Sequence, residues 1–322
     1  MMSIKSVAMR DALLDNIWKE MAVNPSIFFL SADFGSPVLD KIRSDFPSRF
    51  VNVGIAEQNL INISAGLALE GYTVFAYAIA PFITMRCFEQ IRVNLALLSE
   101  VRKMNVNLIG VGAGYSYVVS GPTHQCYEDI TVMRALPNFA VLSPSDHVSA
   151  AKMIDKCLSS AGLRYLRLDA QVLPVLYVNG PPKLNSGFHI HNAEGEVCLV
   201  ATGYMVHTAL QVRENLQKLD YQLAVMDLFD LSTFNKRELN DALSKFKGIV
   251  SLEEGFRGRG GMDAMLLDLL ANSHSSVRLL NLGVEGTYRF EIGTRINLHE
   301  QVGIGPIVVQ QKVLEFIDSF KK

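Results

Sequence analysis

Short apolar runs alternate along the chain with longer stretches whose apolar residues recur every three or four positions. In the first half, this pattern predicts strands at 27–30, 50–53, 73–80, 106–111, 139–142 and 163–168. Helices are predicted between them over 56–69 and 82–99 and from Asp146 onward; Leu60, Ile63 and Leu67 mark one helix face. Strands that alternate with helices pair in parallel, so this half predicts a layered α/β domain.

A second α/β series follows a proline-rich stretch at 171–187. Strands are predicted at 197–201, 223–228, 249–252 and 277–282, with helices after Gly203, near 236–246, after Gly260 and after Pro306. The length of 322 residues also suggests about two domains. We therefore expect a first domain over 1–175, a linker over 176–187 and a second domain over 188–322.

Composition and charge narrow the class of protein. Apolar residues make up 49% and charged residues 19% of the chain, which excludes extensive disorder. A net charge of −2 argues against nucleic-acid binding. The uncharged window 71–85 is too short to span a bilayer, so no membrane association is expected. Four well-separated cysteines and a charged N-terminus without a signal-peptide core predict a cytoplasmic protein.

Three segments of the first domain lie where predicted strands end, at 54–59, 80–82 and 114–125. In open α/β sheets, ligands bind beyond the carboxyl ends of the strands. Glu57 stands at the start of a predicted helix, where an acid is favoured by the helix dipole alone. Its neighbours Val53, Ile55 and Ala56 also allow partial desolvation, which would suit the carboxyl to share a proton with a ligand nitrogen.

Other candidate residues carry weaker signals. His124 follows a turn at 121–123, yet isolated histidines are more often structural. Phe82 and Phe88 lie on a helical pattern, where aromatic residues usually pack in the core. The stretch 253–261 resembles a glycine-rich anion loop but lacks the GxGxxG and P-loop spacings. His189 and His191 lack a third and fourth ligand, so no metal site is expected there.

Taken together, the motifs resemble the transketolase family, which includes 1-deoxy-D-xylulose-5-phosphate synthase. The segments that carry the resemblance are 31–33, VGIAEQN at 53–59, GPTHQ at 121–125, 136–146 and EEG with its glycines at 253–261. They occur in the family's order and at about its spacing, and they cover nearly the whole chain. The resemblance implies a pyrimidine-binding domain followed by a transketolase C-terminal domain.

The resemblance covers only the C-terminal part of a full-length transketolase. The family's GDG…N motif, which serves the metal and the diphosphate, is absent from this sequence. The resemblance therefore implies one subunit of a split transketolase that transfers a two-carbon ketol unit between sugars. It implies thiamine diphosphate with Mg²⁺ as cofactor, held mainly by an N-terminal partner subunit. It also implies self-association within a heterotetramer.

Residue roles follow by matching motifs. Glu57 matches the acid that hydrogen-bonds the aminopyrimidine ring and His124 the histidine that reaches the donor sugar, so both are implied to be catalytic. Phe82 matches the aromatic that stacks on the pyrimidine, and Phe88 lies where the family often has a second ring. The residues implied to bind the acceptor and its phosphate are Arg10, Ser36, Ser120 and Arg167.

Two departures from the family pattern bear on the substrate. Ser120 stands where the family usually has an Asp that contacts the acceptor's 2-hydroxyl. The loop 112–117 lacks the His or Arg that holds phosphate in relatives, a charge-assisted contact worth about 1.5–3 kcal/mol. Tyr115 and Tyr117 instead offer rings and hydroxyls. We hypothesise that the acceptor is larger than a short sugar phosphate or is nucleotide-linked.

Three alternatives remain open from the sequence. The first is a related thiamine enzyme, either a deoxyxylulose-phosphate-synthase-like chain or the β subunit of a 2-oxoacid dehydrogenase. The second is a structural or regulatory subunit that has lost its chemistry, and the third is a binding module without cofactor. The presence of both Glu57 and His124 argues against the second.

Overall fold

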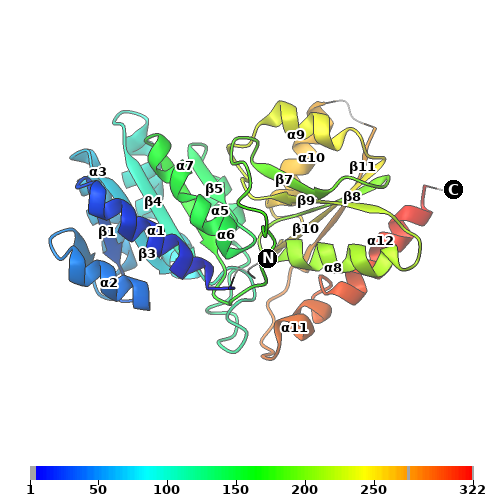
Figure 1. Cartoon of the computed structure of the whole chain (residues 1–322), viewed down its shortest axis with the longest axis horizontal. Coiled ribbons are helices and arrows are strands. Elements are labelled where there is room, and N and C mark those ends of the chain that lie inside the picture. Colours follow the sequence, from blue (N-terminus) through cyan, green and yellow to red (C-terminus); the bar gives the residue numbers. More distant parts are fainter. Residues whose placement is uncertain (1–4, 274–275, 321–322) are drawn as a thin grey trace. The chain divides into compact units, whose positions relative to one another are not determined.

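The computed structural model describes residues 5–273 and 276–320 and divides the chain into two compact units, coloured along the sequence in Figure 1. Unit 1 consists of Met1–Ala113 and Val132–Pro182. Unit 2 consists of Gly114–Thr131 and Lys183–Lys322. Within the described ranges, no helix is both long and apolar enough to cross a bilayer.

Unit 1 is built on a six-stranded sheet in which every pair of neighbours is parallel, with the order β2-β1-β3-β4-β6-β5. The strands are β1 (Ile27–Ser31), β2 (Phe50–Asn52), β3 (Thr73–Ile79), β4 (Asn105–Val111), β5 (Phe139–Leu142) and β6 (Leu163–Leu168). The middle strands are almost entirely buried, as expected when helices cover both faces of a parallel sheet.

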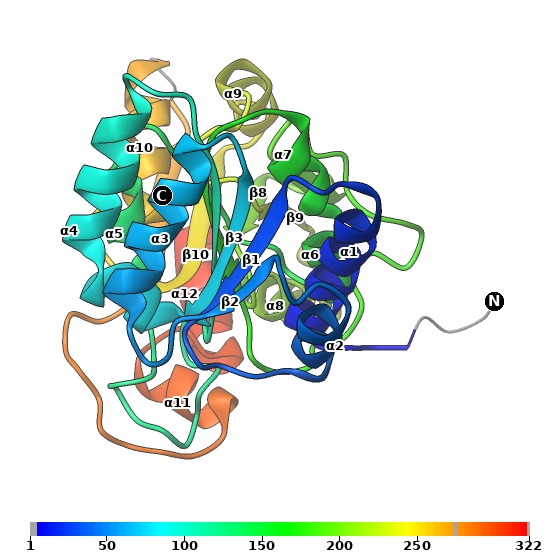
Figure 2. The same cartoon turned by 90° about the vertical axis from the view of Figure 1, so that its left-hand side faces the viewer.

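The helices of unit 1 form two layers. In Figure 2, α3 and α4 lie on one face of the sheet, and α1, α2, α6 and α7 lie on the other. Their bounds are α1 (Met9–Val23), α2 (Pro37–Asp45), α3 (Glu57–Leu69), α4 (Phe88–Gln90), α6 (His147–Lys152) and α7 (Ile154–Ser159), while α5 (Asp129–Arg134) begins in unit 2. The layered α/β fold predicted for this half is confirmed.

The stretch 82–99, predicted as one helix, is interrupted. It consists of two π-helical segments, η1 (Phe82–Arg86) and η2 (Ile91–Leu97), on either side of the single turn α4. Periodicity of apolar residues does not separate α from π turns, because both place residues three to five apart on one side. Such π turns are frequent at functional sites.

Unit 2 is built on a five-stranded mixed sheet with the order β11-β10-β8-β9-β7. The strands are β7 (Phe188–Asn192), β8 (Val197–Ala201), β9 (Leu223–Leu228), β10 (Gly248–Phe256) and β11 (Arg278–Val284). Edge strand β7 pairs antiparallel to β9, whereas the other pairs are parallel. The four strands predicted in this half pair in parallel, whereas β7 is not among the predicted strands. It pairs antiparallel because it enters the sheet from the proline-rich stretch and not from a crossover helix.

Helices cover both faces of the second sheet as well. Figure 1 shows α9 and α10 on one face and α8 and α12 on the other. Their bounds are α8 (Met205–Gln217), α9 (Lys236–Leu243), α10 (Met262–Asn272), α11 (Arg295–Gln301) and α12 (Pro306–Asp318). The mixed sheet confirms a second α/β domain.

Candidate active site and the buried glutamate of unit 2

Glu57 begins α3 directly after the turn that follows β2. The turn requires a left-handed residue, and Gly54 supplies it with φ = +73°. The helix dipole favours an acid in this first turn. The Glu57 side chain is nevertheless buried, with an exposed fraction of 3%. The Glu57 carboxyl is therefore partly desolvated, as its apolar neighbours in the sequence suggested.

Arg86 joins Glu57 to Phe82. Its Nη1 lies 2.8 Å from Oε2 of Glu57, and its guanidinium carbon lies 4.4 Å from the centroid of the Phe82 ring. The Arg86 side chain remains 46% exposed, so solvent reaches this ion pair. Glu57 and Phe82 are thus brought into one cluster through an arginine that the sequence pattern did not single out.

The two residues that follow Arg86 have ordinary structural surroundings. Cys87 donates its thiol hydrogen to the carbonyls of Phe82 and Ile83, and burial raises the pKa of the thiol to about 12. Phe88 is half-buried on α4. The cluster on this side of unit 1 therefore offers one buried carboxylate and one half-exposed ring as its chemical groups.

The other candidates in unit 1 lie on different elements. Ser36 caps α2 by accepting the backbone N–H of Leu39 at 3.1 Å. Its neighbour Gly35 lines a pocket at the carboxyl ends of β1 and β2 that also includes Asp33, Arg43 and Asn52. Arg10 pairs with Asp11 at the start of α1, and Arg167 on β6 is 2% exposed.

His124 belongs to unit 2, because the loop that carries it packs with the C-terminal half of the chain. Its Nδ1 lies 3.0 Å from Oγ1 of Thr123, and its ring lies edge-on to Tyr117 at 6.3 Å between centroids. Gly121 provides the left-handed residue of the turn, with φ = +69°. His124 is half-buried and Ser120 is exposed, so both polar groups are accessible to solvent.

Tyr115 does not present its ring to solvent. It is 1% exposed and packs against Tyr127 at 4.7 Å and His299 at 5.5 Å between ring centroids. Burial raises the pKa of its hydroxyl to about 12. The hypothesis that Tyr115 offers a hydroxyl to the acceptor is therefore not supported by its place in unit 2, whereas Tyr117 is half-buried and reachable.

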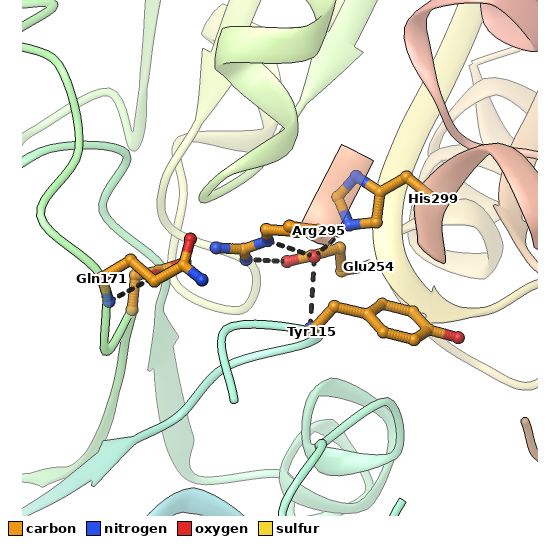
Figure 3. A network of polar contacts seen from close by, with 6 residues as sticks. Tyr115, Gln171, Glu254, Arg295 and His299 are labelled. Carbon is orange, nitrogen blue, oxygen red and sulfur yellow. Dashed lines mark hydrogen bonds and ion pairs between the residues drawn. The ribbon is translucent and has the colours of Figure 1, made fainter. Parts of the chain in front are cut away.

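A buried charge cluster surrounds Glu254, near the end of β10 (Figure 3). Arg295 of α11 donates to both carboxylate oxygens, at 2.9 and 2.6 Å, and His299 Nε2 lies 2.5 Å from Oε1. The backbone N–H of Tyr115 donates to the same Oε1 at 3.2 Å. Burial alone would raise the pKa of Glu254, but Arg295 and His299 hold it well below its ordinary range.

The glycine-rich stretch after Glu254 does not form an anion loop open to a ligand. Glu253 is 1% exposed and accepts the backbone N–H groups of Met262 and Asp263 at 3.0 and 2.9 Å. A Cβ at Gly261 would overlap its Oε2. The chain's own carboxylate therefore occupies the N-terminus of α10, where a phosphate would otherwise bind.

No group of three or more potential metal ligands occurs within residues 5–273 and 276–320. His189 and His191 lie near each other on edge strand β7, with ring centroids 4.8 Å apart. Burial lowers the pKa of His189, which favours its neutral form.

Comparison with known proteins identifies the family. The model of the transketolase pyrimidine-binding domain matches residues 5–175, and the model of the transketolase C-terminal domain matches residues 187–306. Both domains of the chain are therefore of the transketolase type, and the chain belongs to the transketolase family. The resemblance inferred from the motifs is confirmed.

Several relatives are of similar length to this chain. One of the subunits of the apulose-4-phosphate transketolase of Actinobacillus succinogenes is 29% identical over 261 residues, which cover 81% of this chain and 82% of that protein. A putative transketolase C-terminal section of Methanocaldococcus jannaschii is 28% identical, with 82% of each chain covered. Human transketolase is 28% identical over 80% of this chain, but the match spans only 41% of the human protein.

Solved structures agree with this picture. A split-gene transketolase, described as an inactive β4 tetramer, superposes with a TM-score of 0.83 and 27% identity over 97% of this chain and 98% of that one. A transketolase from Pichia stipitis shares the fold, with a TM-score of 0.79 over 47% of its length. The chain is thus similar in extent to split transketolase subunits and to under half of a full-length enzyme.

Proposed function

We propose that this chain is the subunit of a split, thiamine-diphosphate-dependent transketolase that binds the pyrimidine ring of the cofactor. In this proposal, the assembled enzyme moves a two-carbon ketol unit from a ketose donor to a sugar acceptor. The observation that carries the proposal is the pairing of a buried carboxylate, Glu57, with a half-exposed aromatic ring, Phe82, on one side of unit 1.

These residues fit an aminopyrimidine ring. The ring is planar and bears N–H donors, so it needs a stacking surface and an acceptor. In the structure, Phe82 and Glu57 already make both kinds of contact with one planar group that bears N–H donors, the guanidinium of Arg86. Thiamine diphosphate, when bound, supplies the reactive carbon of the reaction. Glu57 would share a proton with a ring nitrogen, Phe82 would stack on the ring, and Phe88 would supply a second aromatic ring to the site.

His124 is proposed to contact the hydroxyl groups of the donor sugar. Its half-buried ring and its contact with Thr123 leave it reachable on its loop. Ser36 is proposed to hold the acceptor's phosphate together with Arg10 and Arg167. Because Ser36 accepts a hydrogen bond from Leu39, its hydroxyl hydrogen is free to donate to an anion at the N-terminus of α2.

The proposal requires a second, different subunit. The GDG…N motif for the diphosphate and its Mg²⁺ does not occur in these 322 residues, and similar proteins of this extent are named as subunits of divided transketolases. An N-terminal transketolase subunit is therefore proposed to hold both. Self-association is supported by the β4 tetramer of the similar split-gene protein, which is described as inactive. The working assembly is proposed to be a heterotetramer of two such chains and two partners.

The acceptor is proposed to differ from a short sugar phosphate. Ser120 replaces the Asp that the family pattern leads one to expect, and loop residues 112–117 contain no cation. Two relatives carry the name apulose-4-phosphate transketolase, at 29% and 26% identity, so that sugar is a candidate to include in a substrate screen. Turnover with ribose 5-phosphate equal to that with every other acceptor would contradict the proposed departure.

A calorimetric titration of thiamine diphosphate with Mg²⁺ tests the proposal. It is run on this chain alone, on the N-terminal subunit alone and on their mixture. Binding that appears only in the mixture, and that weakens in Glu57→Gln, supports a divided cofactor site. Tight binding to this chain alone would contradict the divided cofactor site. A mixture that binds no cofactor would contradict the proposal and favour a structural subunit.

A further inference from the structure

The loop that carries His124 is closed at its base inside unit 2. Gly114 and Cys126 exchange two backbone hydrogen bonds of 2.9 Å, so the residues between them form a single loop. Above this bridge, the Tyr127 hydroxyl donates to Oε1 of Gln125, the residue next to His124. The position of His124 therefore depends on how the two arms of this base are held.

Strand β10 holds both arms. On the outgoing arm, the Glu254 carboxylate accepts the N–H of Tyr115 at 3.2 Å. On the returning arm, the N–H of Phe256 donates to the carbonyl of Tyr127 at 3.4 Å, and the two rings lie 5.3 Å apart. A strand far away in the sequence thus fixes the loop at two points.

The Glu254 carboxylate is itself fixed from the opposite side. Arg295 binds both of its oxygens, and His299 contacts one of them. The guanidinium of Arg295 lies 3.7 Å from the centroid of the Tyr204 ring, which limits its movement. Hydrogen bonds to an ionised carboxylate are stronger than those to a neutral acceptor, so the fixed Glu254 holds the Tyr115 amide more firmly than a neutral group would.

The approach of loop and carboxylate leaves no space for a side chain at Gly114. A Cβ there would overlap Oε2 of Glu254, and the residue has φ = +54°. Both facts require glycine at this position. The loop backbone at Gly114 and Tyr115 is therefore in direct contact with the Glu254 carboxylate.

From this geometry we propose that Glu254 is a positioning residue, which sets the place of His124 by anchoring its loop at Tyr115. The proposal rests on the proposed function, because it gives His124 a task at the substrate. It assigns a role in substrate handling to the C-terminal domain, through a carboxylate that touches no substrate itself.

Hydrogen exchange followed by mass spectrometry tests the proposal on the full chain with its partner. Glu254→Gln keeps the side-chain volume but removes the charge. Amides of 114–127 should exchange about tenfold faster or more, as expected for loss of a charge-assisted hydrogen bond. Turnover should fall through kcat for every donor, while the cofactor titration stays unchanged. Glu253→Gln is the matched control. The Glu253 carboxylate is next to Glu254 in the sequence and is equally buried, but it caps α10, whereas the loop backbone at Tyr115 donates to Glu254.

The control should lower the melting temperature while leaving loop exchange and kcat unchanged. If Glu254→Gln fails to fold, Gly114→Ala replaces it, since that variant displaces the loop without removing a charge. Amide exchange of the loop that is equal in the wild type, Glu254→Gln and Gly114→Ala would overturn the proposal. Faster exchange of the loop without a fall in kcat would also overturn it. If the wild-type complex shows no turnover, the proposed function fails, but exchange still decides whether Glu254 anchors the loop.

Discussion

Two buried glutamates, one in each unit, differ in how their charge is satisfied. Glu57 is 3% exposed and pairs with Arg86, whose side chain is 46% exposed. Glu254 is 1% exposed and binds Arg295, His299 and a backbone amide, with both partner side chains buried as well. One carboxylate faces a partner that solvent can reach, and the other is enclosed by its partners.

This difference separates two uses of the same side chain. A carboxylate with a solvent-reached partner can exchange it for a ligand at small cost, because exposed ion pairs contribute little. A carboxylate enclosed by buried cations cannot, since removing one member leaves an uncompensated charge. This difference supports the proposal that Glu57 takes part in catalysis and that Glu254 holds the loop that carries His124.

The largest expected effect is on turnover in Glu57→Gln. Loss of the proton that Glu57 shares with the cofactor should reduce kcat by about 100- to 10,000-fold, the usual range for general acid–base catalysis. The free energy of unfolding should change by less than about 1 kcal/mol, because the Arg86 pair is partly exposed. Steady-state kinetics of the complex and urea unfolding of the chain give the two numbers.

Glu89→Gln serves as the control for that variant. Glu89 lies on the neighbouring α4 and forms an exposed pair with Arg92 at 3.5 Å. It should leave both kcat and stability unchanged. A similar loss of kcat in both variants would mean that charge in this region matters and not the Glu57 carboxylate.

Stability should respond in the opposite way at Glu254. Glu254→Ala should lower the free energy of unfolding by about 3–5 kcal/mol, because Arg295 is left buried without its partner. Urea unfolding followed by circular dichroism measures the change, with Glu57→Ala as the counterpart. Equal losses in the two variants would contradict the distinction between the two glutamates.

Acid should weaken unit 2 through Glu254. Because the pKa of Glu254 is lowered in the folded state, the unfolded chain binds its proton first as pH falls. Its contribution is fully present above the ordinary pKa of about 4.3 and is lost progressively below it. In Glu254→Gln, the slope of unfolding free energy against pH below about 4 should be shallower by up to about 1.4 kcal/mol per pH unit. An unchanged slope would exclude this carboxylate as the source.

The smallest effect is expected for Arg86→Ala. Arg86 is the half-exposed member of its pair with the buried Glu57, so solvent can replace it beside the carboxylate. The loss of unfolding free energy should stay at about 0–1 kcal/mol, as for exposed ion pairs, and the melting temperature should stay close to that of the wild type. Arg295→Met tests the same point from the other unit and should be clearly destabilising. A large loss of stability in Arg86→Ala would show that Glu57 needs its arginine as much as Glu254 does.

Sequence patterns predicted helices and strands whose position depends on the local spacing of apolar residues. The helix expected over 56–69 forms as α3 from Glu57 to Leu69, and Ala56 stands at its N-cap. The segments at 54–59 and 80–82 follow β2 and β3, which end within one residue of the strands expected at 50–53 and 73–80. Periodicity succeeds there because local burial decides the structure.

The features that patterns missed depend on contacts between distant residues. Arg86 reaches Glu57 across 29 positions, and Arg295 reaches Glu254 across 41. The loop Gly114–Thr131 packs with unit 2 although the residues on both sides of it belong to unit 1. A local sequence pattern cannot identify partners that lie so far apart in the chain. The nearest indication in the sequence was the pair of acids at 253–254 before a glycine-rich stretch, where the structure leaves no room for a side chain at Gly261.

Reconstitution of turnover tests the central claim most directly. Transfer of a two-carbon unit from a ketose donor is followed with this chain alone, with the N-terminal subunit alone and with the two mixed, each with thiamine diphosphate and Mg²⁺. We predict turnover only in the mixture, saturating as this chain is titrated to equal amounts and absent when it carries Glu57→Gln. Turnover by one of the two subunits alone, or equal turnover in mixtures made with wild type and Glu57→Gln, would contradict the account.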